Sequence, residues 1–106
     1  MVSIKEIQSL YKAKAVVFTD HFLERIQKRG ILFSNIKTAI NNGEIIEQYP
    51  DDYPYPSVLI LEHSNNDVPL HVVIGVGNGL VWLVTAYRPD DDKWEMDYKT
   101  RKADNE

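Results

Sequence analysis

Cysteine is missing altogether from this sequence of 106 residues. Its absence excludes a disulfide framework, a thiolate zinc site, an iron–sulfur cluster and a cysteine nucleophile. Long apolar runs are missing too, because no stretch approaches the roughly 20 residues that a transmembrane helix needs. The first residues, MVSIKEIQSLYKAK, are interrupted by charges and do not have the form of a signal peptide. We therefore expect a cytoplasmic protein.

The length predicts one domain over residues 1–106, since a chain of this size has no room for a second core. Basic residues are fewer than acidic residues, and the two kinds are unevenly distributed along the chain. The net charge is −4, yet residues 1–37 carry seven Lys or Arg against three Asp or Glu, and residues 38–95 carry two against ten. The acidic total argues against indiscriminate nucleic-acid binding. The basic first third permits a local anion site, or is an ordinary solvated helix surface.

Helical periodicity comes first in the sequence and strand periodicity follows, an order that predicts an α+β fold with helices packed on one antiparallel sheet. Thr19 or Asp20 is expected to cap the second helix and Gly30 to end it, while Ser34 is expected to cap the third. The stretch AVVF at 15–18 is either a short extended connection or the end of the first helix. The predicted helices span residues 3–12, 20–29 and 35–42.

Four strands follow, so the expected fold is N-terminal helices on a curved, about four-stranded antiparallel sheet. Gly77-Asn78-Gly79 predicts a hairpin turn between the last two strands, and residues 64–67 predict another turn. The glycines are not followed by a helix, so they do not predict a phosphate-binding loop. Residues 90–106 are expected to form a short helix or an extended arm. The predicted strands span 44–49, 57–63, 70–76 and 80–88.

His21, Arg25 and Arg29 recur at every fourth position and therefore form one row on the second predicted helix. Phosphodiester transfer uses such a set, because histidine moves protons near neutral pH and arginine binds phosphate with two donors. Alternatively, the arginines are solvated and His21 is an ordinary polar residue at a helix start.

In the predicted hairpin, the numbers of two residues that lie opposite each other should add up to about 156. This register brings His71 opposite Thr85 and near Tyr87, although both also fit purely structural roles.

The histidines do not predict a metal site. His21, His63 and His71 match no zinc-binding spacing, and no cysteine assists them. The acidic run Asp90–Asp92 suits helix capping better than cation binding. We expect neither a metal nor another cofactor.

Four segments together resemble the DUF4258 family of RelE-like proteins. The resemblance covers about residues 19–95, and the pieces occur in the family's order. The segments are HFLERIQKRGI at 21–31, NNGEIIEQYP at 41–50, PLHVVIGV at 69–76 and VTAYRPDDDKW at 84–94.

This resemblance implies a RelE-like fold, shared with barnase-type and colicin-type ribonucleases, and a toxin that pairs with an antitoxin. The antitoxin would be a small protein, with the MqsA-like zinc-finger type as one option, and the ribosome is a further expected partner besides RNA. The catalytic positions that carry over are His21, Arg25, His71, Tyr87 and Arg88. For binding RNA we expect Lys28, Arg29, Trp94 and Tyr98.

The leading hypothesis is thus a metal-independent endoribonuclease toxin that cleaves single-stranded or messenger RNA by attack of a 2′-hydroxyl. A non-enzymatic binding module would use the same basic cleft for a protein or nucleotide partner. A structural subunit of a larger assembly would instead need a broad apolar surface patch.

Overall fold

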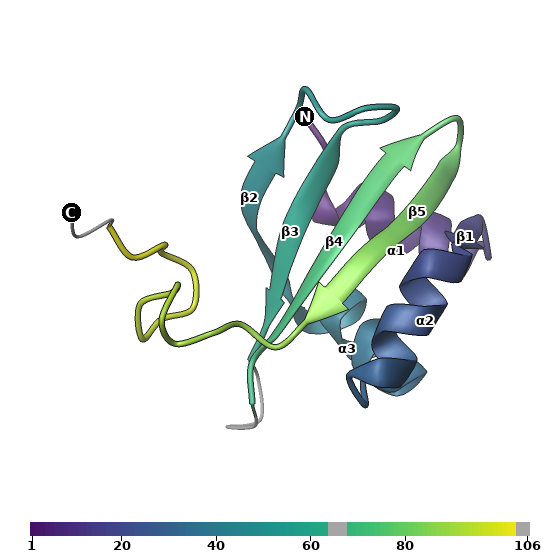
Figure 1. Ribbon diagram of the computed structural model, residues 1–106. Helices are drawn as coiled ribbons and strands as arrows, with labels where there is room; N and C mark the ends of the chain where they lie inside the picture. The colour runs from purple at the N-terminus through teal and green to yellow at the C-terminus, as the bar shows by residue number, and fades with distance from the viewer. Residues whose placement is uncertain (64–67, 104–106) are drawn as a thin grey trace.

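The computed structural model describes residues 1–63 and 68–103, and in these residues it has three helices and five strands. The strands form one open mixed sheet in the order β1-β5-β4-β3-β2 (Figure 1). The helices lie together on one side of the sheet, so the predicted α+β class with N-terminal helices is confirmed. The elements are α1 (Ile4–Lys12), β1 (Val16–Phe18), α2 (Asp20–Lys28), α3 (Phe33–Asn42), β2 (Glu44–Tyr49), β3 (Ser57–Glu62), β4 (Leu70–Gly77) and β5 (Leu80–Tyr87).

The helices begin at side chains that accept free backbone N–H groups. Thr19 caps α2 as predicted, because its hydroxyl accepts from the N–H of Phe22 at 3.1 Å. The expected cap of α3 is wrong, since that helix starts one residue before Ser34. Its N-cap is Leu32, whose backbone N–H donates to the Asn35 side chain at 2.9 Å. The amide of Asn35 thus replaces the hydroxyl that the sequence suggested.

Strands β2 to β5 are antiparallel and lie within one residue of the predicted ranges. The expectation of about four antiparallel strands is nevertheless wrong, because β1 is a fifth strand and runs parallel to β5, with Val16 opposite Val81. Three residues are too few to show the alternation of a strand, and a parallel partner lies far away in the chain. The turn expected at 64–67 lies outside the described residues.

The hairpin between β4 and β5 has a tighter turn than predicted. Asn78 and Gly79 alone form it, with φ of 56° and 73°, the signature of a two-residue type I′ turn. The register shifts again between Val73 and Ile74, where β5 contains a bulge. Both deviations change the partner of His71, which lies opposite Tyr87 and not opposite Thr85.

The core lies between the helices and one face of the sheet. Alternate residues of each strand point into it, for example Ile60 of β3 and Ile74 of β4, and meet Phe22 and Ile40 of the helices. The intervening residues point to the opposite side, which we call the open face. His71 is one of these intervening residues. A C-terminal arm, residues 89–103, packs against part of the open face (Figure 1).

Candidate functional site

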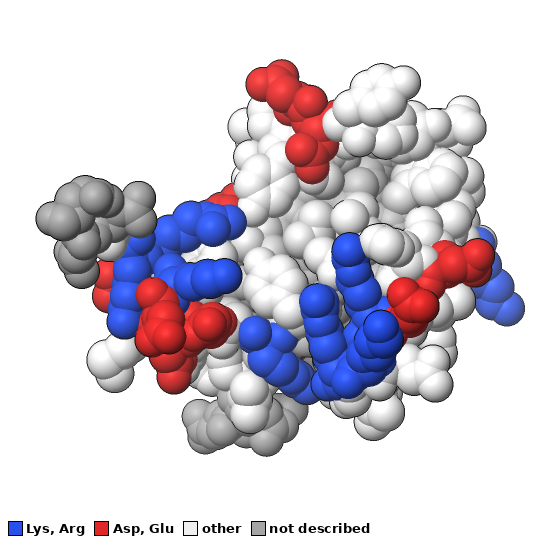
Figure 2. Space-filling view, viewed as in Figure 1, with Lys and Arg blue, Asp and Glu red and all other residues white. Residues whose placement is uncertain are grey.

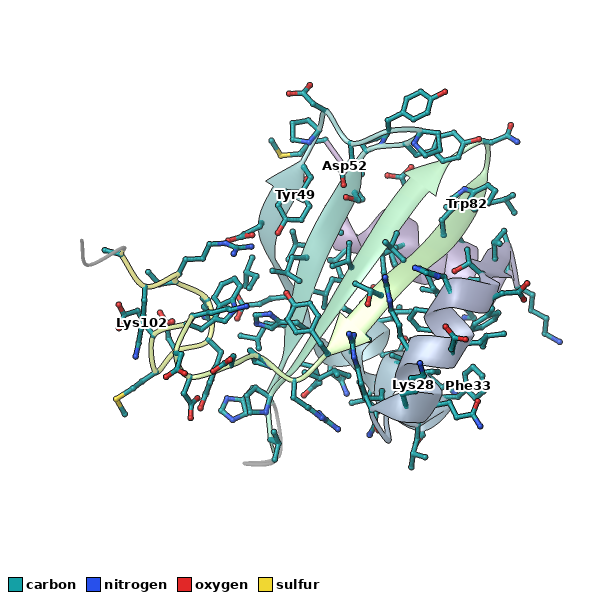
Figure 3. All side chains as sticks on the ribbon, viewed as in Figure 1. Lys28, Phe33, Tyr49, Asp52, Trp82 and Lys102 are labelled. Atoms are coloured by element: carbon teal, nitrogen blue, oxygen red, sulfur yellow. The ribbon has the colours of Figure 1, made fainter. Side chains whose placement is uncertain are left out.

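Groups of polar side chains lie on the open face and along its borders. Tyr49 of β2 and Trp82 of β5 lie at opposite sides of this face (Figure 3). Trp82 stacks on Tyr55, with ring centroids 5.3 Å apart. Helix α2 borders the face beside β5, and the C-terminal arm borders it on the side of β2 (Figure 1). The candidate site is therefore a sheet surface between a helix and an arm.

On α2, the predicted row brings His21 and Arg25 into direct contact. The Arg25 guanidinium donates a hydrogen bond to Nε2 of His21 at 2.8 Å. Because a guanidinium only donates, Nε2 is the acceptor in this contact. His21 is exposed and Arg25 half-buried. An exposed imidazole with its lone pair held beside a fixed cation is a suitable base for a hydroxyl next to a phosphate.

Arg29 continues this row and fixes α2 to β5. Its Nη1 donates to the carbonyl of Ala86 at 2.8 Å and to the hydroxyl of Thr85 at 3.3 Å. The position follows from the shortness of β1, which ends opposite Leu83, so that the rest of the outer edge of β5 has no strand partner among the described residues. Burial is the largest effect on the pKa of Tyr87 and raises it, against smaller opposing effects of Arg101 and Arg29.

His71 lies elsewhere, beneath the arm. Its side chain is fully buried, and the rings of Trp94 and Tyr87 stand edge-on to it at 4.6 and 5.3 Å. Nε2 bonds the Tyr98 carbonyl at 2.9 Å and therefore carries the proton, because a carbonyl only accepts. Nδ1 is then the acceptor for the Tyr87 hydroxyl at 3.3 Å. Burial lowers the pKa of His71, so its neutral form is favoured.

The arm is held down by Glu47, which sequence reasoning missed. Arg101 donates two hydrogen bonds to this carboxylate, at 3.0 and 3.1 Å, and lies over the Trp94 ring at 4.6 Å from its centroid. The Tyr49 hydroxyl donates a further bond to Glu47. Burial raises the pKa of Glu47, but the bonds from Arg101 and Tyr49 outweigh burial and lower it overall. Burial and the bond to Glu47 raise the pKa of Tyr49 to about 12.

A signal for this group was present in the sequence. Glu47 and Tyr49 are two residues apart on one strand, so they had to share a face, and both belong to the segment NNGEIIEQYP. Arg101 carried no comparable signal. It stands beyond the last predicted strand, in a segment without periodicity.

The remaining predicted residues are engaged in contacts within the protein. Arg88 donates to the carbonyls of Val68 at 3.0 Å and Pro69 at 3.4 Å, so it links β5 to the start of β4. Trp94 is only 3% exposed and is not available to a base while the arm is in this position. The Tyr98 hydroxyl donates to a carboxylate of the arm at 3.1 Å. Of the predicted set, only His21, Lys28 and Arg29 on α2 and Arg88 after β5 are exposed.

Charge is distributed in two basic groups around an uncharged centre (Figure 2). One group lies over α2 and the end of β5, and the other lies over the arm, where acidic side chains accompany it. Lys28 and Lys102 mark these opposite sides (Figure 3). In the described residues, no three His, Asp or Glu side chains are placed to hold a metal ion together.

The fold and the site define a class: a small α+β domain in which a histidine–arginine row on one helix borders an open sheet face. Comparison with known proteins makes this more specific. The chain belongs to the family described as Domain of unknown function (DUF4258), which it matches over residues 18–88. This range contains α2 and the strands of the site but neither α1 nor the arm. No curated protein and no solved structure matches the chain.

In residues 1–63 and 68–103, no helix has the length and apolar character to cross a membrane.

Proposed function

We propose that this protein is a metal-independent endoribonuclease that binds single-stranded or messenger RNA along the border between α2 and the open face. The single observation that most supports this proposal is the exposed imidazole of His21, whose Nε2 lies 2.8 Å from a guanidinium nitrogen of Arg25. Arg29, at the C-cap of the same helix, adds a second cation, which donates to the carbonyl of Ala86, the residue before Tyr87. The arrangement also suits a RelE-like nuclease toxin held by an antitoxin, with the ribosome as a further partner.

In the proposed reaction, phosphate of the RNA attracts Arg25 and so frees Nε2 of His21. Nε2 then takes the proton of the 2′-hydroxyl while the 2′-oxygen forms a bond to phosphorus. The bond from phosphorus to the 5′-oxygen breaks, and that oxygen takes a proton from the Tyr87 hydroxyl, which gives up its hydrogen bond to Nδ1 of His71 in this step. Arg25 and Arg29 stabilise the charge on the phosphate oxygens. The products are a 2′,3′-cyclic phosphate and a free 5′-hydroxyl.

His71 has a different role from the one expected of an acid or base in contact with RNA. Both ring nitrogens are already bonded, and the side chain is fully buried. In this proposal His71 is a positioning residue that orients the Tyr87 hydroxyl. The raised pKa of Tyr87 keeps that hydroxyl protonated at neutral pH, as a proton donor must be.

The test is to incubate the purified protein with RNA and with DNA of the same sequence, both in excess EDTA. Cleavage of RNA alone, with a cyclic phosphate terminus, is expected. His21→Ala should reduce the rate by about 10²–10⁴ and Arg25→Ala by about 10²–10³. His63→Ala and Lys5→Ala, at exposed positions away from α2, serve as controls and should retain the rate.

Equal cleavage of DNA, loss of activity in EDTA, or full activity in both α2 variants would contradict the proposal. A protein that is silent on free RNA is tested next on translating ribosomes, since a toxin of this type can require them. Failure there as well leaves the second candidate, a non-enzymatic binding module. The burial of His71 favours that function, and RNA binding that depends on Arg25 and Arg29 without cleavage would identify it.

A further inference from the structure

A groove on the helical side of the molecule is not part of the candidate site. It has a volume of about 800 Å³ and lies between α1, α3 and β1. Lys12, Lys14 and Lys37 line it together with Tyr11 and Phe18, and its described lining contains neither Asp nor Glu. The groove is thus locally positive in a protein of net charge −4. Such a surface attracts a negatively charged partner.

An exposed apolar patch continues from this groove. Phe18 is 38% exposed and stands edge-on to Phe33, with ring centroids 5.6 Å apart. Phe33 is 54% and Leu32 63% exposed. Both also line a second hollow of about 410 Å³, whose other walls include Ile26 and Ile31. Figure 3 places Phe33 beside the helices, away from Tyr49 and Lys102. Contiguous apolar surface of this kind marks an interaction site more often than scattered exposed residues do.

We infer that this docking surface binds an acidic, amphipathic segment of a partner protein. The surface consists of Lys12, Lys14, Phe18, Leu32, Phe33 and Lys37. Apolar side chains of the segment would enter the hollow beside Phe33, and its carboxylates would meet the three lysines. The outer edge of β1 has no strand partner within residues 1–63 and 68–103. An extended part of the segment can therefore pair with β1 through backbone hydrogen bonds.

Protein fits this surface better than RNA does. Arginine, which binds phosphate with two donors, is absent from the described lining of both hollows, and the cations that line the groove are lysines. The described lining of the hollow next to Phe33 is mostly isoleucine and leucine, which match an aliphatic or aromatic anchor, and it contains no cation for a phosphate. A second copy of this chain is the other protein occupant to test.

The experiment is a selection from a display library of random peptides against the purified protein. We expect enrichment of peptides that combine Asp or Glu with Leu, Ile or Phe. An enriched peptide, labelled with fluorescein, is then titrated by anisotropy. The double variant Leu32→Ser/Phe33→Ser should bind it about tenfold or more weakly, because buried apolar area is lost. The triple variant Lys12→Glu/Lys14→Glu/Lys37→Glu should lose binding, and Lys5→Glu on α1 should retain it.

Several results would overturn this inference. One is a selection that enriches no peptide, or that enriches basic peptides. Another is peptide binding that is unchanged in both the Leu32→Ser/Phe33→Ser variant and the lysine variant. Doubling of the mass in solution, reversed by Leu32→Ser/Phe33→Ser, would identify a self-interface. RNA binding that is lost in the lysine variant while peptide binding is unchanged would identify a nucleic-acid surface. The residues differ from those of the candidate site, so RNA cleavage in these variants is a separate measurement and should be unchanged. Thermal unfolding of each variant shows that it is folded.

Discussion

Arg29 shows how one exposed side chain connects two elements. It belongs to the predicted phosphate-binding row of α2, yet its guanidinium also occupies the edge of β5 that β1 is too short to cover. A backbone carbonyl at a sheet edge needs a donor, and Arg29 supplies it to Ala86. One residue therefore carries two roles, in structure and in the proposed binding of RNA.

Removing Arg29 should accordingly affect stability even without RNA. Arg29→Ala is expected to lower the free energy of unfolding by about 1 kcal/mol, since each such hydrogen bond contributes about 0.5–1.5 kcal/mol net and water partly replaces it. Thr85→Val removes only the longer bond, of 3.3 Å, and should cost less. Urea denaturation of both variants measures this. An equal loss in both variants would show that the bond to Ala86 is not the important one.

At the scale of elements, the C-terminal arm covers part of the open face, which would otherwise be exposed. It buries His71, sets the tautomer of that ring through the Tyr98 carbonyl, and is fastened by Arg101 to Glu47. Lys99 adds an ion pair with Glu44 at 2.9 Å, but both side chains are exposed and such pairs contribute little. The fastening therefore depends chiefly on Glu47 and His71, which both titrate.

Acid should loosen the arm in two steps. The pKa of His71 is lower in the folded protein than its ordinary value of 6.5, so its contribution to stability is complete above about that pH and is lost as the pH falls through the folded pKa. The pKa of Glu47 is likewise below its ordinary 4.5, so its contribution is complete above about that pH and is lost as the pH falls through its own folded pKa. Trp94 fluorescence, measured in a Trp82→Phe background, should shift to longer wavelength as the ring meets water.

Glu47→Gln provides the control for this titration. It removes the carboxylate that Arg101 binds, so Trp94 should already be more exposed at neutral pH, and the step that belongs to Glu47 should disappear. The step that belongs to His71 should remain. A Trp94 signal that is unchanged from neutral pH down to the onset of acid unfolding would contradict the assignment.

For the whole molecule, the sequence predicted what depends on neighbours in the chain. Alternation and turn residues located β2 to β5, and the spacing of four residues predicted the row in which His21 and Arg25 are in contact. Features that depend on distant partners escaped prediction. The strand β1 needs β5, and Glu47 needs Arg101, so no local pattern reveals either. The bulge in β5, which brings His71 opposite Tyr87, likewise follows from packing of the whole sheet.

The parallel pairing of β1 with β5 has a consequence for the order of folding. Each of the strands β2 to β5 pairs with a strand that is next to it in the sequence. Val16 of β1, in contrast, pairs with Val81 of β5, far along the chain. Contacts between distant segments form late, because closing a long loop costs entropy first. Val16→Ala should therefore speed unfolding and leave the folding rate nearly unchanged, whereas Ile74→Val in β4 should slow folding. Stopped-flow kinetics in urea distinguish these outcomes.

On the ribosome, this order has a direct meaning. The residues of β1 leave the exit tunnel well before β5, the strand that completes them, has been synthesised. Until β5 emerges, Val16 and Phe18 remain without their partner, and the basic helix α2 has no sheet edge on which to fix Arg29. The histidine–arginine row would therefore reach its final place only after β5 has been synthesised.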